Sequence, residues 1–72
     1  MKVLIVGSGG REHALAWKAK HSKLTTQIYV APGNGGTANE GGVTNIEIAA
    51  NDIDGLANFV QSNEIDLTIV GP

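Results

Sequence analysis

A short apolar run near the N-terminus is followed by a glycine-rich turn and an arginine, a combination that can bind an anion. The residues are Gly7, Gly9, Gly10 and Arg11. A turn of this kind before a helix presents free backbone N–H groups, and an arginine can grip a phosphate through two parallel hydrogen bonds. In the structural alternative, the glycines only close a tight turn and Arg11 pairs with a surface acid. The spacing alone leaves both interpretations open.

Two further candidates for substrate binding, Glu12 and His13, follow the turn directly. An acid in the first turn of a helix interacts favourably with the helix dipole, which is a simpler role for Glu12 than catalysis. His13 fits a hydrogen-bonded structural histidine as well as a direct ligand of the anion. We see no carboxylate pair and no metal-binding cluster in the sequence.

The turn departs from the fingerprint of dinucleotide-binding proteins. That fingerprint requires Gly-x-Gly-x-x-Gly and an acid about 20 residues later, at the end of the second strand. Glu12 occupies the third glycine position, and the second predicted strand ends at Ala31 and Pro32 without an acid. No Gly-Lys-Ser/Thr follows the turn, so a nucleotide P-loop is excluded as well. We therefore expect no nicotinamide or flavin cofactor.

Two other turns carry the remaining candidates for substrate binding. They are Pro32, Gly33, Asn34, Gly36 and Thr37 in one turn, and Gly71 and Pro72 in the other. The side chains of Asn34 and Thr37 can bind sugar hydroxyls, or they can form the turn and cap a helix. These two roles also stay open at this point.

The order of predicted elements favours an α/β fold with a mainly parallel, four-stranded sheet. Strands are predicted over 2–6, 27–31, 43–49 and 66–70, and helices over 10–21 and 51–63. Right-handed crossovers then give the strand order 3-2-1-4, with the most apolar strand central. All three glycine-rich turns would lie at the C-terminal ends of strands, where such sheets bind ligands.

The apolar spacing within each predicted helix indicates which side chains face the sheet. The small and apolar positions of the first helix are Ala14, Leu15, Ala16, Trp17 and Ala19; Leu15 and Ala19 are four residues apart, and Ala14 and Trp17 are three apart. Together they predict one broad apolar face, with Trp17 in the core. In the second helix, Ile53, Leu56, Ala57 and Val60 follow the spacing of a buried stripe.

Composition limits the classes of function. The 72 residues make one domain at most, and their formal charge of −2 without a basic block argues against nucleic acid and anionic membranes as partners. No apolar run approaches the roughly 20 residues of a membrane span, and we expect no targeting segment. The absence of cysteine excludes disulfides and thiolate metal sites, which agrees with a cytoplasmic location.

Three segments together resemble the N-terminal domain of the glycinamide ribonucleotide synthetase family, within the ATP-grasp superfamily. They are VGSGGREHALAWK at 6–18, VAPGNGGT at 30–37 and IDLTIVGP at 65–72. The resemblance implies a three-layer, Rossmann-like (pre-ATP-grasp) domain. Family members join glycine to 5-phosphoribosylamine while ATP is cleaved to ADP and phosphate, which gives glycinamide ribonucleotide in de novo purine biosynthesis.

The resemblance also implies roles for parts of this chain. Gly9, Gly10 and Arg11 would contact the sugar phosphate, and 32–37 would form a neighbouring wall of the site. The small-molecule substrates would be 5-phosphoribosylamine, glycine and ATP. The full-length enzyme would use ATP with Mg²⁺ or Mn²⁺, and would be a cytoplasmic monomer.

Members of that family are several times longer than this chain. We therefore expect residues 1–72 to be a phosphoribosylamine-binding domain that is incomplete at its C-terminus and lacks the ATP-grasp domains. Catalytic residues, metal ligands, ATP and activity would all be absent from these residues alone. One alternative is a stand-alone phosphate- or nucleotide-binding module with a Rossmann-like fold. Another is the N-terminal domain of a biotin-dependent carboxylase, which the Arg-Glu-His sequence disfavours.

Overall fold

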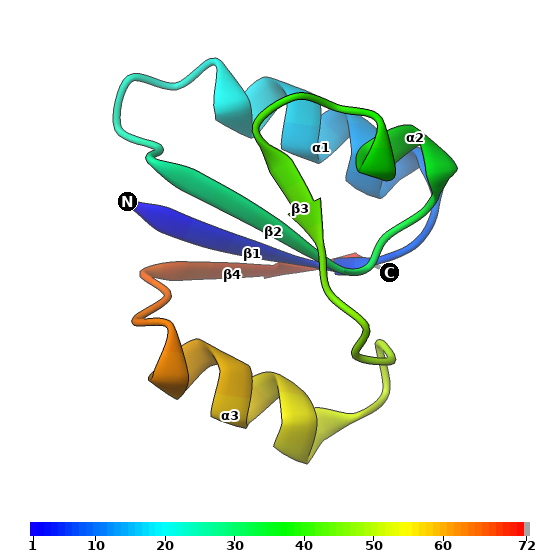
Figure 1. Cartoon of the computed structure of the whole chain (residues 1–72), viewed down its shortest axis with the longest axis vertical. Coiled ribbons are helices and arrows are strands. Elements are labelled where there is room, and N and C mark those ends of the chain that lie inside the picture. Colours follow the sequence, from blue (N-terminus) through cyan, green and yellow to red (C-terminus); the bar gives the residue numbers. More distant parts are fainter. Residues whose placement is uncertain (72) are drawn as a thin grey trace.

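The computed structural model describes residues 1–71, which form a central sheet with helices on both of its faces (Figure 1). The elements in chain order are β1 (Lys2–Gly7), α1 (Gly10–Lys20), β2 (Gln27–Pro32), α2 (Gly35–Ala38), β3 (Val43–Asn45), α3 (Ile53–Ser62) and β4 (Leu67–Val70). Helices α1 and α2 lie on one face of the sheet and α3 lies on the other. The predicted three-layer α/β architecture is confirmed.

The four strands are all parallel, in the order β3-β2-β1-β4. The predicted order is therefore confirmed, and the sheet is parallel throughout. Gly7 of β1 pairs with Pro32 of β2, and Val6 pairs with Val70 of β4. Because parallel strands end at the same edge of a sheet, the three glycine-rich turns meet at one edge, as the sequence predicts.

Strand β1 is central because both of its faces are buried. Residues 3–6 are at most 3% exposed, which explains their uninterrupted apolar sequence. Val3 and Ile5 pack with Ala16 of α1. Leu4 and Val6 pack on the side of α3. The two core clusters thus fix α1 and α3 on opposite faces.

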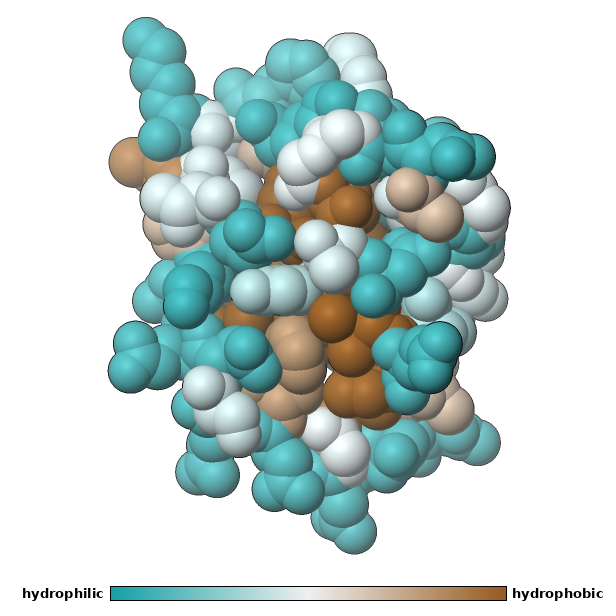
Figure 2. Space-filling model, in the orientation of Figure 1, coloured by the Kyte–Doolittle hydropathy of each residue, from teal (hydrophilic) through white to brown (hydrophobic). Residues whose placement is uncertain are grey.

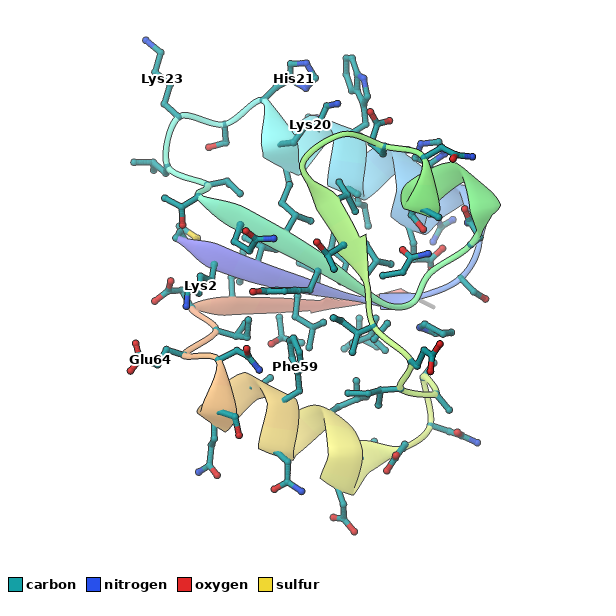
Figure 3. The ribbon with its side chains drawn as sticks, viewed as in Figure 1. Lys2, Lys20, His21, Lys23, Phe59 and Glu64 are labelled. Atoms are coloured by element: carbon teal, nitrogen blue, oxygen red, sulfur yellow. The ribbon has the colours of Figure 1, made fainter. Side chains whose placement is uncertain are left out.

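Helix α3 packs against the sheet through Leu56, Phe59 and Val60. Figure 3 shows Phe59 pointing from α3 towards the sheet, where its ring meets Tyr29 edge-on at a centroid distance of 5.0 Å. Hydrophobic residues are visible in Figure 2 on both sides of the sheet, within a largely hydrophilic surface. The predicted stripe is wrong at two of its four positions, because Ile53 is 70% exposed and Ala57 is exposed as well, whereas Leu56 and Val60 are half-buried.

The predicted core position of Trp17 is wrong. Its side chain is 53% exposed and its ring lies beside that of His21, with centroids 4.4 Å apart. Ala14 of the same predicted face is exposed as well, whereas Ala16 is fully buried and Leu15 and Ala19 are half-buried. Small alanines let α1 approach the sheet closely, and Trp17 is turned away because neighbouring helix positions differ by about 100° in direction.

Strand β3 is shorter than the predicted strand over 43–49. It ends at Asn45, and the N–H of Ile46 still donates to the carbonyl of Val30 at 2.8 Å. Beyond this point the chain leaves the sheet, and Ile46 and Ile48 pack in the cluster on the α3 side. The strand ends early because the chain must cross to the opposite face before α3 begins.

Candidate functional site

The turn between β1 and α1 is built around the carboxylate of Glu12. This side chain is only 6% exposed, and its Oε2 accepts a hydrogen bond from the N–H of Gly9 at 3.0 Å. Gly9 is the N-cap residue of α1, so Glu12 reaches back over the first turn as in a capping box. The acid at the third fingerprint position therefore folds into the turn.

Three glycines make room for this carboxylate. A Cβ added at Gly7 or Gly71 would collide with the carboxylate of Glu12, and one at Gly9 would lie 3.0 Å from its Oε2. Gly7 also has a φ of +146°, which L side chains rarely adopt. Gly71 is held in place by its own N–H, which donates to the carbonyl of Val6 at 2.9 Å. The ends of β1 and β4 therefore close around Glu12.

A cavity of about 350 Å³ opens beside this carboxylate, between the C-terminal ends of β1 and β4. It is lined by Val6, Gly7, Ser8, Gly9, Glu12, Ala50, Val70 and Gly71. The strand order reverses between β1 and β4, which is where open α/β sheets bind ligands. Sequence reasoning missed Ala50, because no local pattern shows that the segment before α3 returns to this edge.

Arg11 lies on the first turn of α1, one residue before Glu12 of the cavity lining, and it is exposed. Within residues 1–71 it forms no ion pair, so the alternative in which it pairs with a surface acid is not realised there. The other four cations lie elsewhere: Lys18 and Lys20 in the last turn of α1, and Lys2 and Lys23 at the edge where the strands begin (Figure 3). Arg11 and the helix N-terminus therefore supply the positive charge at this edge.

The second predicted turn is fastened to the first through Asn34. Its Nδ2 donates to the carbonyls of Ser8 and Gly9 at 2.8 and 3.0 Å, and its Oδ1 accepts from the N–H of Thr37 at 2.9 Å. The N–H of Gly33 adds a bond to the carbonyl of Gly7 at 3.1 Å. The capping interpretation of Asn34 is confirmed, and the same side chain also positions the glycine turn.

Thr37 is fully buried at the centre of a polar network. Its Oγ1 accepts from the N–H of Asn34 at 2.7 Å, and it lies 2.8 Å from Oδ1 of Asn45. The Nδ2 of Asn45 donates to the carbonyl of Asn34 at 3.0 Å. Sequence reasoning missed Asn45, because its alternation with Ile46 placed it on the exposed side of a strand.

His13 is bound to a structural acid and does not line the cavity. Its Nε2 lies 3.1 Å from Oε1 of Glu40, and Lys20 donates to the other oxygen of the same carboxylate. A Cβ at Gly36 would approach Nδ1 of His13 to 2.6 Å, so the ring packs directly on α2. These contacts agree with the structural interpretation of His13. Pro32, at the exposed end of β2, also lies outside the cavity lining, and Pro72 lies outside the described residues.

Hydrogen bonds from Lys20 and, to a smaller extent, from His13 lower the pKa of Glu40 below its ordinary value of 4.5. A lowered folded-state pKa means that the ion pair stabilises the protein above this value and that the stabilisation is lost as the pH falls through the folded pKa. We expect Glu40→Gln to be less stable than the wild type near neutral pH, with the difference disappearing in acid. Thermal unfolding across this pH range measures it. The exposed Glu47→Gln is the matched control, and an equal pH dependence of Glu40→Gln and wild type would contradict the assignment.

Among residues 1–71, no group of three or more His, Cys, Asp or Glu side chains is arranged to hold a metal ion. None of the helices in this part of the chain has the length and apolar character needed to cross a membrane.

Comparison with known proteins identifies the family to which this site belongs. The family model described as "Phosphoribosylglycinamide synthetase, N domain" matches residues 1–72. The chain belongs to this family. The resemblance drawn from the three sequence segments is thereby confirmed, and the glycine turn with Arg-Glu-His lies within the phosphoribosylglycinamide synthetase N domain.

Proteins named phosphoribosylamine–glycine ligase match the whole chain. The chain is 67% identical to the protein of Allochromatium vinosum, 62% identical to that of Yersinia pestis and 58% identical to that of Escherichia coli K12, over 72 residues in each case. All of this chain is covered, but only 17% of each relative. The chain thus spans about a sixth of the length of these phosphoribosylglycinamide synthetase relatives.

Proposed function

We propose that this chain is the sugar-phosphate-binding part of an enzyme that ligates glycine to 5-phosphoribosylamine. The observation that carries the proposal is the position of Arg11 on the first turn of α1, next in sequence to Glu12 of the cavity lining; Arg11 is exposed and forms no ion pair in residues 1–71. The first N–H groups of a helix have no partners within the helix, and its N-terminus favours anions. Arg11 and these N–H groups bind the phosphate.

The reaction that we propose for the whole enzyme is the ATP-dependent formation of glycinamide ribonucleotide, a step of purine biosynthesis. The relatives' name, which gives phosphoribosylamine and glycine as the two molecules that are ligated, supports it. Residues 1–72 are proposed to be the phosphoribosylamine-binding domain. ATP, Mg²⁺ or Mn²⁺ and glycine would bind in parts of the longer enzymes that these residues do not represent. The monomeric state and cytoplasmic location of the whole enzyme stay predictions.

Replacing Arg11 with alanine tests the phosphate site. A hydrogen bond to a charged group contributes about 1.5–3 kcal/mol, so we expect Arg11→Ala to weaken binding of ribose 5-phosphate by roughly tenfold or more. Titration of the polypeptide followed by amide NMR shifts gives the affinity and also shows whether Gly9 and Gly10 respond. Lys18→Ala removes the same charge from the other end of α1 and is expected to bind as the wild type does. Equal affinity of Arg11→Ala and Lys18→Ala would overturn the assignment.

A further inference from the structure

One oxygen of the Glu12 carboxylate has no internal hydrogen-bond partner. Oε2 is bound by the N–H of Gly9, whereas no donor within residues 1–71 binds Oε1. In this part of the chain, every completely buried side-chain nitrogen or oxygen has a partner, so Oε1 must reach open space. The side chain is 94% buried and lines the cavity between β1 and β4, so that space is the cavity.

A capping role does not explain this arrangement. A capping box needs one acceptor oxygen, and glutamine fulfils it as well as glutamate. Here the second oxygen lies against Gly7 and Gly71, at positions where any side chain would collide with it. In the cavity this oxygen can accept a hydrogen bond from water or from a ligand. The position of Oε1 therefore leaves one acceptor open to a ligand that donates and takes the place of water.

We propose that Oε1 of Glu12 accepts a hydrogen bond from a ribose hydroxyl of the bound sugar phosphate. This inference rests on the proposed function and assigns the sugar half of the same site. An ionised carboxylate accepts hydrogen bonds and repels a phosphate. The phosphate is therefore assigned to Arg11 and a ribose hydroxyl to Glu12. Dinucleotide-binding sheets place an acid for the ribose at the end of the second strand. In this chain Glu12 supplies that acid from the helix.

The test compares two ligands and two variants. The ligands are ribose 5-phosphate and tetrahydrofurfuryl phosphate, which keeps the ring and the phosphate but lacks the ring hydroxyls. Glu12→Gln retains an acceptor for the N–H of Gly9 and removes the charge. Glu64→Gln makes the same change at the opposite edge of the sheet, where the strands begin (Figure 3). Affinities come from NMR titration, and thermal unfolding reports whether each variant keeps its stability.

We expect the wild type and Glu64→Gln to prefer ribose 5-phosphate over the hydroxyl-free ligand by about tenfold or more. In Glu12→Gln this preference should fall towards one, while affinity for the hydroxyl-free ligand is unchanged or increased. An unchanged preference in Glu12→Gln, or an equal loss for both ligands, would overturn the role of Glu12 alone. If the wild type binds both ligands equally, the inference also fails, whether or not the variant folds. If the wild type binds neither, the proposed function fails with it.

Discussion

Replacing Gly7 with alanine is expected to destabilise the protein by about 2–4 kcal/mol, from backbone strain and from displacement of a buried carboxylate. The φ of Gly7 is +146°, and an added Cβ would lie 2.5 Å from Cδ of Glu12. The glutamate cannot yield easily, because it is buried and bound to the N–H of Gly9. The variant must therefore distort the end of β1 or expel Glu12 from the turn.

Urea unfolding monitored by circular dichroism measures this loss, and amide NMR spectra show whether the glycine turn is rearranged. Gly41→Ala is the matched control, because Gly41 is exposed, its Cβ would meet nothing within 4 Å, and its φ is not positive. We expect the control to change stability by no more than about 1 kcal/mol. A Gly7→Ala protein as stable as Gly41→Ala would show that the turn does not depend on the position of Glu12.

The fold is predictable from the sequence because its main signals are local. The uninterrupted apolar run of β1 is typical of a strand that is buried on both faces, as β1 is. Glycine-rich turns mark where the strands end, and a parallel sheet then brings those ends to one edge. The prediction that Trp17 lies in the core is wrong because the local signal in α1 is ambiguous. Alanine spacing allows more than one apolar face on α1, and only packing against the sheet selects Ala16.

The candidate site is predictable as a location but not in its detail. Gly7, Gly9, Glu12 and Gly71 come together as expected of residues at the ends of β1 and β4. The inward direction of the Glu12 carboxylate depends on two glycines that are 64 residues apart in sequence, Gly7 and Gly71, and no local pattern contains that information. Asn45 is missed for the same reason, since its role depends on a turn that precedes it along the chain.

Thr37→Val is expected to cost about 2–4 kcal/mol, although valine has nearly the shape of threonine. The change removes the acceptor of the N–H of Asn34 and the hydroxyl that faces Oδ1 of Asn45. Both groups lie in a partly buried network, and each unsatisfied buried polar group costs about 1–3 kcal/mol. Loss of this network also loosens Asn34, whose Nδ2 binds the carbonyls of Ser8 and Gly9.

We therefore expect Thr37→Val to disturb the glycine turn even in molecules that remain folded. The free energy of unfolding in urea is compared for Thr37→Val and Thr37→Ser, because serine keeps the hydroxyl and loses only the methyl group. Thr68→Val is the control, since Thr68 is exposed and has no hydrogen-bonded partner among the described side chains. We expect Thr68→Val to stay within about 0.5 kcal/mol of the wild type. In Thr37→Val that remains folded, the amide signals of Gly9 and Gly10 should broaden or shift, since Asn34 no longer holds the turn. Unchanged signals would mean that the first turn holds its shape through Glu12 alone.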